Sequence, residues 1–193
     1  MKSLSDDRDP GSGGAMRRAW LLVALLFAAV ACSPGGGAVE STTSSGEAAA
    51  WRTAPLRDAR TGETFRIDDL QGALVVIEQM AIWCTTCRAQ QREAAAALSE
   101  VGGDDVVYIS LDVDPNEAEA DLARYADEQG FGWRFAVASP QVARSLADSF
   151  GEQVLSPPST PGIIVRPDGA VEGVSFGIKK AEQLVAEFRE HAP

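Results

Sequence analysis

The stretch EQMAIWCTTCRAQ, residues 78–90, places Cys84 and Cys87 three positions apart in a chain that has only one other cysteine. It begins inside the apolar run ALVVIEQM (73–80), which has the composition of a strand buried on both faces. The residues after Cys84 are rich in Ala, Gln, Arg and Glu and predict a helix that ends at the glycine pair 102–103. The cysteine pair therefore lies where a buried strand passes into a helix.

Three kinds of site have two cysteines at this spacing: a zinc site, a structural disulfide and a redox pair. A structural zinc site usually has four ligands, commonly two such pairs or a pair with histidines, and only Cys84 and Cys87 remain if Cys32 is lipidated. A disulfide that closes so short a loop removes little entropy from the unfolded chain. At a helix start, unpaired N–H groups and the helix dipole favour the Cys84 thiolate, the nucleophilic form. We predict a redox pair in which Cys84 attacks and Cys87 resolves.

The rest of the chain alternates between strand and helix patterns. In chain order, the further predicted elements are a short strand around Phe65 and Ile67, a buried strand at 106–113, a helix capped by Asp114, a helix capped by Ser139 with Pro140 first, a hairpin over 162–176 that turns at 167–169, and a helix over 181–188. This order predicts an α/β sandwich with central parallel strands, a final antiparallel hairpin and helices on both faces.

The N-terminal segment has the composition of a targeting sequence rather than of a fold. Two arginines precede the apolar run 19–31, which ends in small residues before Cys32, as in a secretory signal peptide. The run is shorter than the ~20 residues that a membrane-spanning helix needs. The ending AAVAC (28–32) resembles a bacterial lipobox, which implies lipidation of Cys32, and an uncleaved anchor is the alternative. The acidic residues before Met16 are unlike such a segment, so Met16 is a candidate start.

These patterns divide the chain into three parts. Residues 1–32 form the extension and signal segment, 33–50 are a flexible Gly/Ser/Thr/Ala linker, and 51–193 form one folded domain. The domain is then expected outside the cytoplasm, where a cysteine pair is oxidised unless a donor keeps it reduced. The net charge of −11 argues against nucleic acid or an anionic membrane surface as the main partner and is explained by solubility.

The sequence VVIEQMAIWCTTC (75–87), together with this order of elements, resembles the thioredoxin superfamily. The lipid anchor and the inserted helix are similar to its TlpA/ResA-like, membrane-anchored extracytoplasmic branch. The resemblance covers roughly residues 54–190 and implies a thioredoxin-like three-layer sandwich with a central mixed β-sheet. Thr85 and Thr86 replace the Gly-Pro or Pro-Pro that is commoner between the cysteines, which leaves the direction of electron flow open.

The resemblance also implies roles for four further residues. Glu78 corresponds to the buried acid that shuttles the proton of Cys87, and Trp83 to the aromatic residue beside the nucleophile. Thr160 and Pro161, in STPGIIV (159–165), correspond to the loop with a cis proline that lies beside the disulfide and binds substrate. Three of them have a structural alternative: Glu78 as a strand carboxylate that reaches solvent, Trp83 as a packing residue, and Pro161 as a trans proline.

The implied function is a lipoprotein thiol–disulfide oxidoreductase that needs no cofactor or metal. Its partners would be cysteine-containing exported proteins on the periplasmic side and a membrane thiol that donates electrons, and cytochrome c biogenesis is the family-level candidate process. The alternative is a Sco-like copper-binding module, which PPSTPG (157–162) also resembles, but that family has C-x-x-x-C and a distant histidine. A peroxiredoxin is excluded, because Ala81 stands where its threonine would precede Cys84.

Overall fold

The computed structural model describes residues 49–193. The signal-like run, Cys32 and the linker up to residue 48 lie outside the described residues, so their predicted roles remain predictions. None of the described helices combines the length and the apolar composition needed to cross a membrane.

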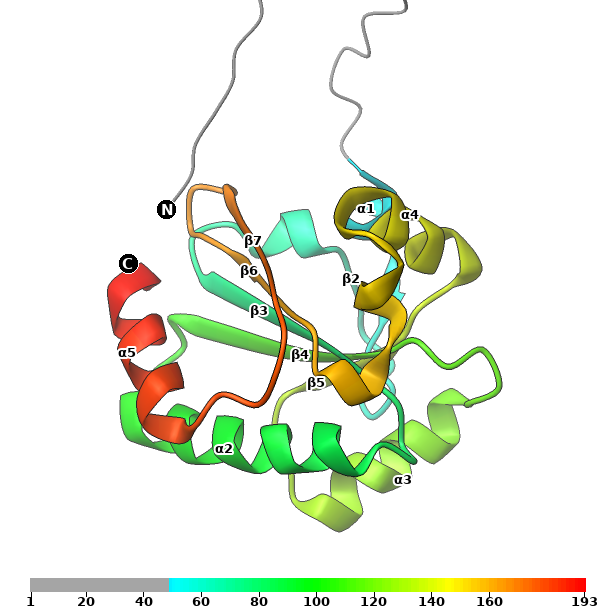
Figure 1. Ribbon diagram of the computed structural model, residues 1–193, viewed down its shortest axis with the longest axis horizontal. Helices are drawn as coiled ribbons and strands as arrows, with labels where there is room; N and C mark the ends of the chain where they lie inside the picture. Colours follow the sequence, from blue (N-terminus) through cyan, green and yellow to red (C-terminus); the bar gives the residue numbers. More distant parts are fainter. Residues whose placement is uncertain (1–48) are drawn as a thin grey trace, which may run out of the picture. The chain divides into compact units, whose positions relative to one another are not determined.

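A five-stranded mixed sheet forms the centre of the fold (Figure 1). In sheet order the strands are β5 (Arg134–Val137), β4 (Val106–Asp112), β3 (Leu74–Met80), β6 (Gly162–Val165) and β7 (Val171–Ser175). β3, β4 and β5 are parallel, whereas β6 is antiparallel to both β3 and β7. All residues of the central strand β3 are buried, as its continuous apolar run predicts. The predicted mixed sheet with a final hairpin is confirmed.

Helices cover both faces of this sheet and complete three layers (Figure 1). They are α1 (Ala50–Thr53), α2 (Thr85–Val101), α3 (Glu119–Gln129), α4 (Pro140–Phe150) and α5 (Ala181–His191). Alternate residues of β3 serve the two faces: Val75 and Ile77 pack with α1 and α4, while Leu74 and Val76 pack with α2 and α5. By the same alternation, Glu78 faces the α2 and α5 layer.

The remaining elements are short. They are the antiparallel pair β1 (Leu56–Arg57) and β2 (Thr64–Phe65) and the 3₁₀ turns η1 (Ile67–Leu70), η2 (Glu152–Leu155) and η3 (Pro157–Ser159). The strand expected around Phe65 and Ile67 therefore ends at Phe65, and Ile67 opens a 3₁₀ turn. The predicted order also lacked β5, which has only four residues and too few positions to show a pattern.

The two predicted helix caps have different outcomes. Ser139 caps α4 as expected, because its Oγ accepts a hydrogen bond from the Val142 N–H at 3.2 Å. The cap expected at Asp114 is wrong: α3 begins at Glu119. The Asp114 carboxylate accepts instead from the backbone N–H of Asn116 and from the indole of Trp83, at 2.9 and 2.7 Å.

Candidate active site

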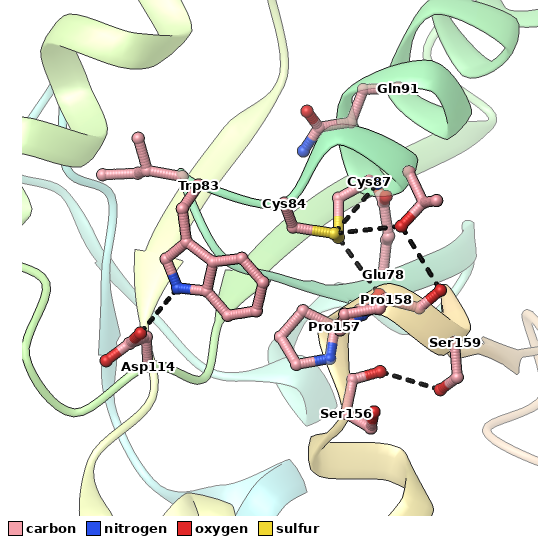
Figure 2. Close-up of a disulfide and its surroundings, with 12 residues drawn as sticks. Glu78, Trp83, Cys84, Cys87, Gln91, Asp114, Ser156, Pro157, Pro158 and Ser159 are labelled. Carbon is pink, nitrogen blue, oxygen red and sulfur yellow. Dashed lines mark hydrogen bonds between the residues drawn. A yellow bond between two sulfur atoms is a disulfide. The ribbon is translucent and has the colours of Figure 1, made fainter.

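Cys84 and Cys87 form a disulfide at the junction of β3 and α2 (Figure 2). Cys84 is the N-cap residue of α2, and its Sγ accepts a hydrogen bond from the Cys87 N–H at 3.1 Å. A sulfur in this position takes the place of a capping oxygen and lies at the positive end of the helix dipole. The geometry therefore favours a thiolate at Cys84 when the disulfide is reduced.

In the disulfide form the sulfur atoms are almost entirely covered. Cys84 is 2% exposed and Cys87 is fully buried, so the difference in accessibility between them is smaller than the sequence suggests. The Thr86 hydroxyl lies 3.2 Å from the Cys84 Sγ and 3.3 Å from the Pro158 carbonyl oxygen. The Pro157 carbonyl oxygen lies 3.2 Å from the Cys87 Sγ, where it can accept from a thiol. Sequence analysis assigned no role to Pro157 and Pro158, although they precede Thr160 and Pro161 in PPSTPG.

Trp83 lies beside the disulfide, and its indole nitrogen points to Asp114 (Figure 2). It is 55% exposed, so it is not a packing residue of the core. Its Nε1–H donates to the Asp114 Oδ2 at 2.7 Å, and this hydrogen bond lowers the pKa of Asp114. The indole is therefore held at a defined angle next to the cysteines, a suitable surface for an apolar substrate side chain.

Thr160 and Pro161 lie beside the end of β3, immediately before Gly162, which pairs with Glu78. The Pro161 carbonyl accepts from the Gln79 N–H at 3.2 Å, and the Thr160 N–H donates to the Pro157 carbonyl at 2.8 Å. Thr160 has a φ of 44° and is the only described residue other than glycine with a positive φ. Such a backbone costs energy in a β-branched residue and is kept where the surroundings require it. The Pro157 carbonyl joins this loop to the disulfide, because it accepts from the Thr160 N–H and lies 3.2 Å from the Cys87 Sγ.

Glu78 is buried beneath α2, and the alternative that it reaches solvent is wrong. It is 2% exposed, and its Oε2 accepts from the Tyr108 hydroxyl at 3.1 Å and from the Ser110 hydroxyl at 3.4 Å. Burial raises the pKa of Glu78 from 4.5 to about 8, although these hydrogen bonds act in the opposite direction. Among the described residues, no hydrogen bond joins Glu78 to either sulfur in the disulfide form, so its role toward Cys87 remains a prediction.

A second buried carboxyl lies on the other side of the Trp83 segment. Asp112 ends β4 and is fully buried, and burial, together with the nearby Glu117 carboxylate, raises its pKa. Glu117 in turn accepts from the Ile82 N–H at 2.8 Å, one residue before Trp83. The loop after β4 therefore holds the residues that lead into Cys84. Sequence analysis did not identify this carboxyl.

The structure places His191 far from the cysteines. Arg189, near the end of α5, donates to Glu100 at 3.1 Å and so sets the end of α5 beside the C-terminal end of α2. The cysteines lie at the other end of α2, whose 17 residues span about 25 Å. The described residues therefore provide no imidazole at Cys84 and Cys87, and a copper site of two cysteines and a histidine does not fit.

The fold is similar to that of solved thioredoxin-like structures. A thiol:disulfide interchange protein of the thioredoxin family from Chlorobium tepidum aligns over 72% of this chain and 94% of its own, with a TM-score of 0.57 and 18% identity. The exposed lipoprotein thioredoxin Etrx1 of Streptococcus pneumoniae aligns over 70% and 97%, with a TM-score of 0.54 and 19% identity. Copper-bound ScoI of Arabidopsis thaliana aligns over 71% and 94%, with a TM-score of 0.56 and 16% identity.

No protein-family model and no curated protein matches the chain in sequence. At identities below 20% the structural likeness concerns the fold. The domain has the thioredoxin-like fold, as its sequence predicts, and the chemistry has to be argued from the site itself.

Proposed function

We propose that the chain is a thiol–disulfide oxidoreductase that exchanges disulfides with cysteines of exported proteins through Cys84 and Cys87. The position of the Cys84 sulfur carries this proposal: it caps α2 and accepts the Cys87 N–H, with a protonatable carboxyl buried behind it. A cysteine in that position is a better nucleophile near neutral pH than a free cysteine.

The reaction begins when the pair is reduced. The Cys84 thiolate attacks one sulfur of a substrate disulfide, a bond forms between Cys84 and that sulfur, and the other substrate sulfur leaves as a thiolate. Cys87 then loses its proton and attacks the Cys84 sulfur, which restores the Cys84–Cys87 disulfide and releases the second substrate thiolate. The substrate gains two electrons and the pair loses two. The same steps in reverse oxidise a dithiol substrate.

Glu78 would hold the proton that Cys87 gives up or regains. A pKa of about 8 keeps most of this carboxyl protonated at neutral pH, so it can protonate the Cys87 thiolate when the disulfide opens. The minor carboxylate fraction can accept the proton when Cys87 attacks. A pKa near the working pH allows both transfers, which exchange in either direction requires.

The proposed location is the extracytoplasmic face of the membrane, with a lipid at Cys32 as the anchor. The support is the basic and apolar segment that ends in AAVAC, and the similar structure of Etrx1, which is an exposed lipoprotein. The periplasmic substrates proposed from the resemblance include apocytochrome c, and a membrane thiol would return electrons to the pair.

Trapping of the intermediate tests the proposed function. Cys87→Ala should accumulate a mixed disulfide between Cys84 and a disulfide-containing peptide, because no second thiol can resolve it. Cys84→Ala should trap none, since Cys87 lies inside the first turn of α2, where the helix start favours its thiolate less. Equal trapping by the two variants, or trapping by neither, would contradict the proposal. Equilibration of the wild type with glutathione gives the reduction potential and hence the direction of electron flow.

A further inference from the structure

The two oxygens of Glu78 have different surroundings. Oε2 accepts from both Tyr108 and Ser110, which are residues of the neighbouring strand β4. Oε1 is buried and has no hydrogen-bond partner among the described residues. The carboxyl is therefore held by one oxygen and leaves the other for proton exchange.

The hydrogen of the Ser110 hydroxyl has only one direction available. Ser110 Oγ accepts from the Trp133 Nε1–H at 2.9 Å and from the Gln91 amide at 3.2 Å, and both of these groups are pure donors. Its own hydrogen must then point to the third neighbour, Oε2 of Glu78. Gln91 is oriented in the same way, because its Oε1 accepts from the Tyr125 hydroxyl at 2.5 Å. The Ser110 hydroxyl is thus a second donor, of fixed direction, to Oε2 of Glu78.

Glu78 also lines a cavity of about 30 Å³ together with Thr160 and Pro161. The Thr160 Oγ1 is buried and, like Oε1 of Glu78, has no partner among the described residues. A cavity of this size has room for about one or two water molecules. The two residues that carry the unpaired oxygens, Glu78 and Thr160, thus line the same small space.

We propose that Tyr108 and Ser110 are positioning residues for Glu78: by binding Oε2 they make Oε1, on the side of the Thr160 cavity, the atom that gains and loses the proton. This inference rests on the proposed function for its role in catalysis, although the position of the carboxyl can be tested without it. In the exchange reaction, the proton released by Cys87 would arrive at Oε1 and leave from it.

Other titratable and charged groups surround this carboxyl. Lys179, just before α5, and Glu187, on α5, line the same cavity. They form an ion pair with an N–O distance of 2.6 Å, so their charges offset each other. From α2 come Cys87 and Arg88, and from α3 Tyr125, with the Arg88 guanidinium 5.7 Å from the Tyr125 ring centroid. Tyr108 and Ser110 donate to the Glu78 carboxylate, and the Gln91 side chain also lowers the pKa of Glu78.

Two tyrosines allow a matched test. Tyr108→Phe removes a hydroxyl that donates to Glu78, and Tyr125→Phe removes a hydroxyl that donates to Gln91. Both rings are buried, at 3% and 4% exposure. Donors stabilise the charged carboxylate, so Tyr108→Phe should raise the pKa of Glu78 by about one pH unit, a tenfold change in proton affinity. Tyr125→Phe acts on Glu78 only indirectly, through Gln91, and should raise this pKa by much less.

The measurement is an NMR titration of the Glu78 side-chain carboxyl carbon in the oxidised protein, with Glu78→Gln to assign the signal. Ser110→Ala is the second variant and should also raise the pKa. An equal rise in Tyr125→Phe, or no rise in Tyr108→Phe, overturns the inference whether or not the protein exchanges disulfides.

Kinetics then separate this inference from the proposed function. In Tyr108→Phe the pH midpoint of mixed-disulfide resolution should move upward together with the NMR pKa. If the NMR pKa moves in a protein that traps no mixed disulfide, the proposed function fails and the positioning of Glu78 stands. If resolution occurs but its pH midpoint does not move, the proposal that Tyr108 positions Glu78 for the reaction is wrong.

Discussion

At the scale of single residues, Glu78 combines two opposing environments. Its burial under α2 disfavours the charged form, while the Tyr108 and Ser110 hydroxyls stabilise that form. Burial is the larger effect, and the pKa rises to about 8. The residue is thus costly to the fold at alkaline pH and useful to a reaction that moves protons near neutrality.

Glu78→Gln should change how stability depends on pH. The native protein holds a proton that the unfolded chain releases above a pKa of 4.5, so the free energy of unfolding should fall as pH rises from about 4.5 to about 8. One such proton is worth about 1.4 kcal/mol per pH unit across that window. The variant lacks this slope and should be more stable than the wild type at pH 8. Some slope should remain, because Asp112 also has a raised pKa.

Urea denaturation of the oxidised proteins at pH 5 and pH 8 measures the effect. Glu190→Gln, at an exposed position on α5, is the control and should behave as the wild type. In the exchange reaction, Glu78→Gln should slow resolution of the mixed disulfide and leave the first attack nearly unchanged. Parallel stability profiles for Glu78→Gln and the wild type would mean that the carboxyl is not protonated in the fold.

At the scale of elements, a cysteine sulfur caps the first turn of α2. The Cys84 sulfur replaces the usual capping oxygen, and the turn brings the Thr86 hydroxyl within 3.2 Å of it. In the disulfide form this hydroxyl can donate to the Pro158 carbonyl. When the disulfide is reduced, the same hydroxyl can turn and donate to a thiolate. The residues between the cysteines therefore add a donor that a proline at position 86 would lack.

Thr86→Val should raise the pKa of Cys84 in the reduced protein. The substitution keeps the β-branched shape and removes the donor to the thiolate, so we expect a rise of about one pH unit. The rate of alkylation by iodoacetamide as a function of pH measures it. Thr85→Val, in the same turn but exposed, is the matched control and should leave the pKa in place. The same rise in both variants would show that the Thr86 hydroxyl has no specific role.

At the scale of the whole molecule, the sheet order brings segments that are far apart in the sequence together at the C-terminal end of β3. β3 lies between β4 and β6, so the residues that follow β3 meet the loop after β4 on one side and the loop before β6 on the other. Asp114 and Glu117 come from the first loop and Pro157, Pro158 and Thr160 from the second. The cysteines, their cover and the indole are assembled by this arrangement (Figure 2).

The proposed anchor predicts the behaviour of the full chain in cells. Cys32→Ala should release the protein from membranes and abolish labelling by a fatty-acid probe, because lipidation needs the thiol. Membrane fractionation of the wild type and the variant in a bacterial host measures this. If the variant stays membrane-bound and unprocessed, the segment is an uncleaved anchor and the lipoprotein proposal is wrong.

Some features of the domain depend on residues close together in the chain, and the sequence alone determined them. The buried strand β3, the helix after Cys84, the Ser139 cap and the final hairpin follow from local periodicity, capping and turn chemistry. The position of Cys84 at a helix start is also local, since strand and helix adjoin in sequence. These predictions hold because the tertiary structure does not oppose them.

Only the tertiary structure decided the features that join distant residues. Asp114 lies five residues before α3 begins, and its carboxylate binds an indole 31 positions earlier in the chain. Tyr108 and Ser110 bind Glu78, and Gln91 binds Ser110, because β4 pairs with β3 in the sheet and α2 packs over that part of it, a relation that no local pattern contains. The pKa of Glu78 depends on that burial, and burial is a property of the packed layers. Local free-energy preferences choose the elements, and their packing sets the chemistry of the groups between them.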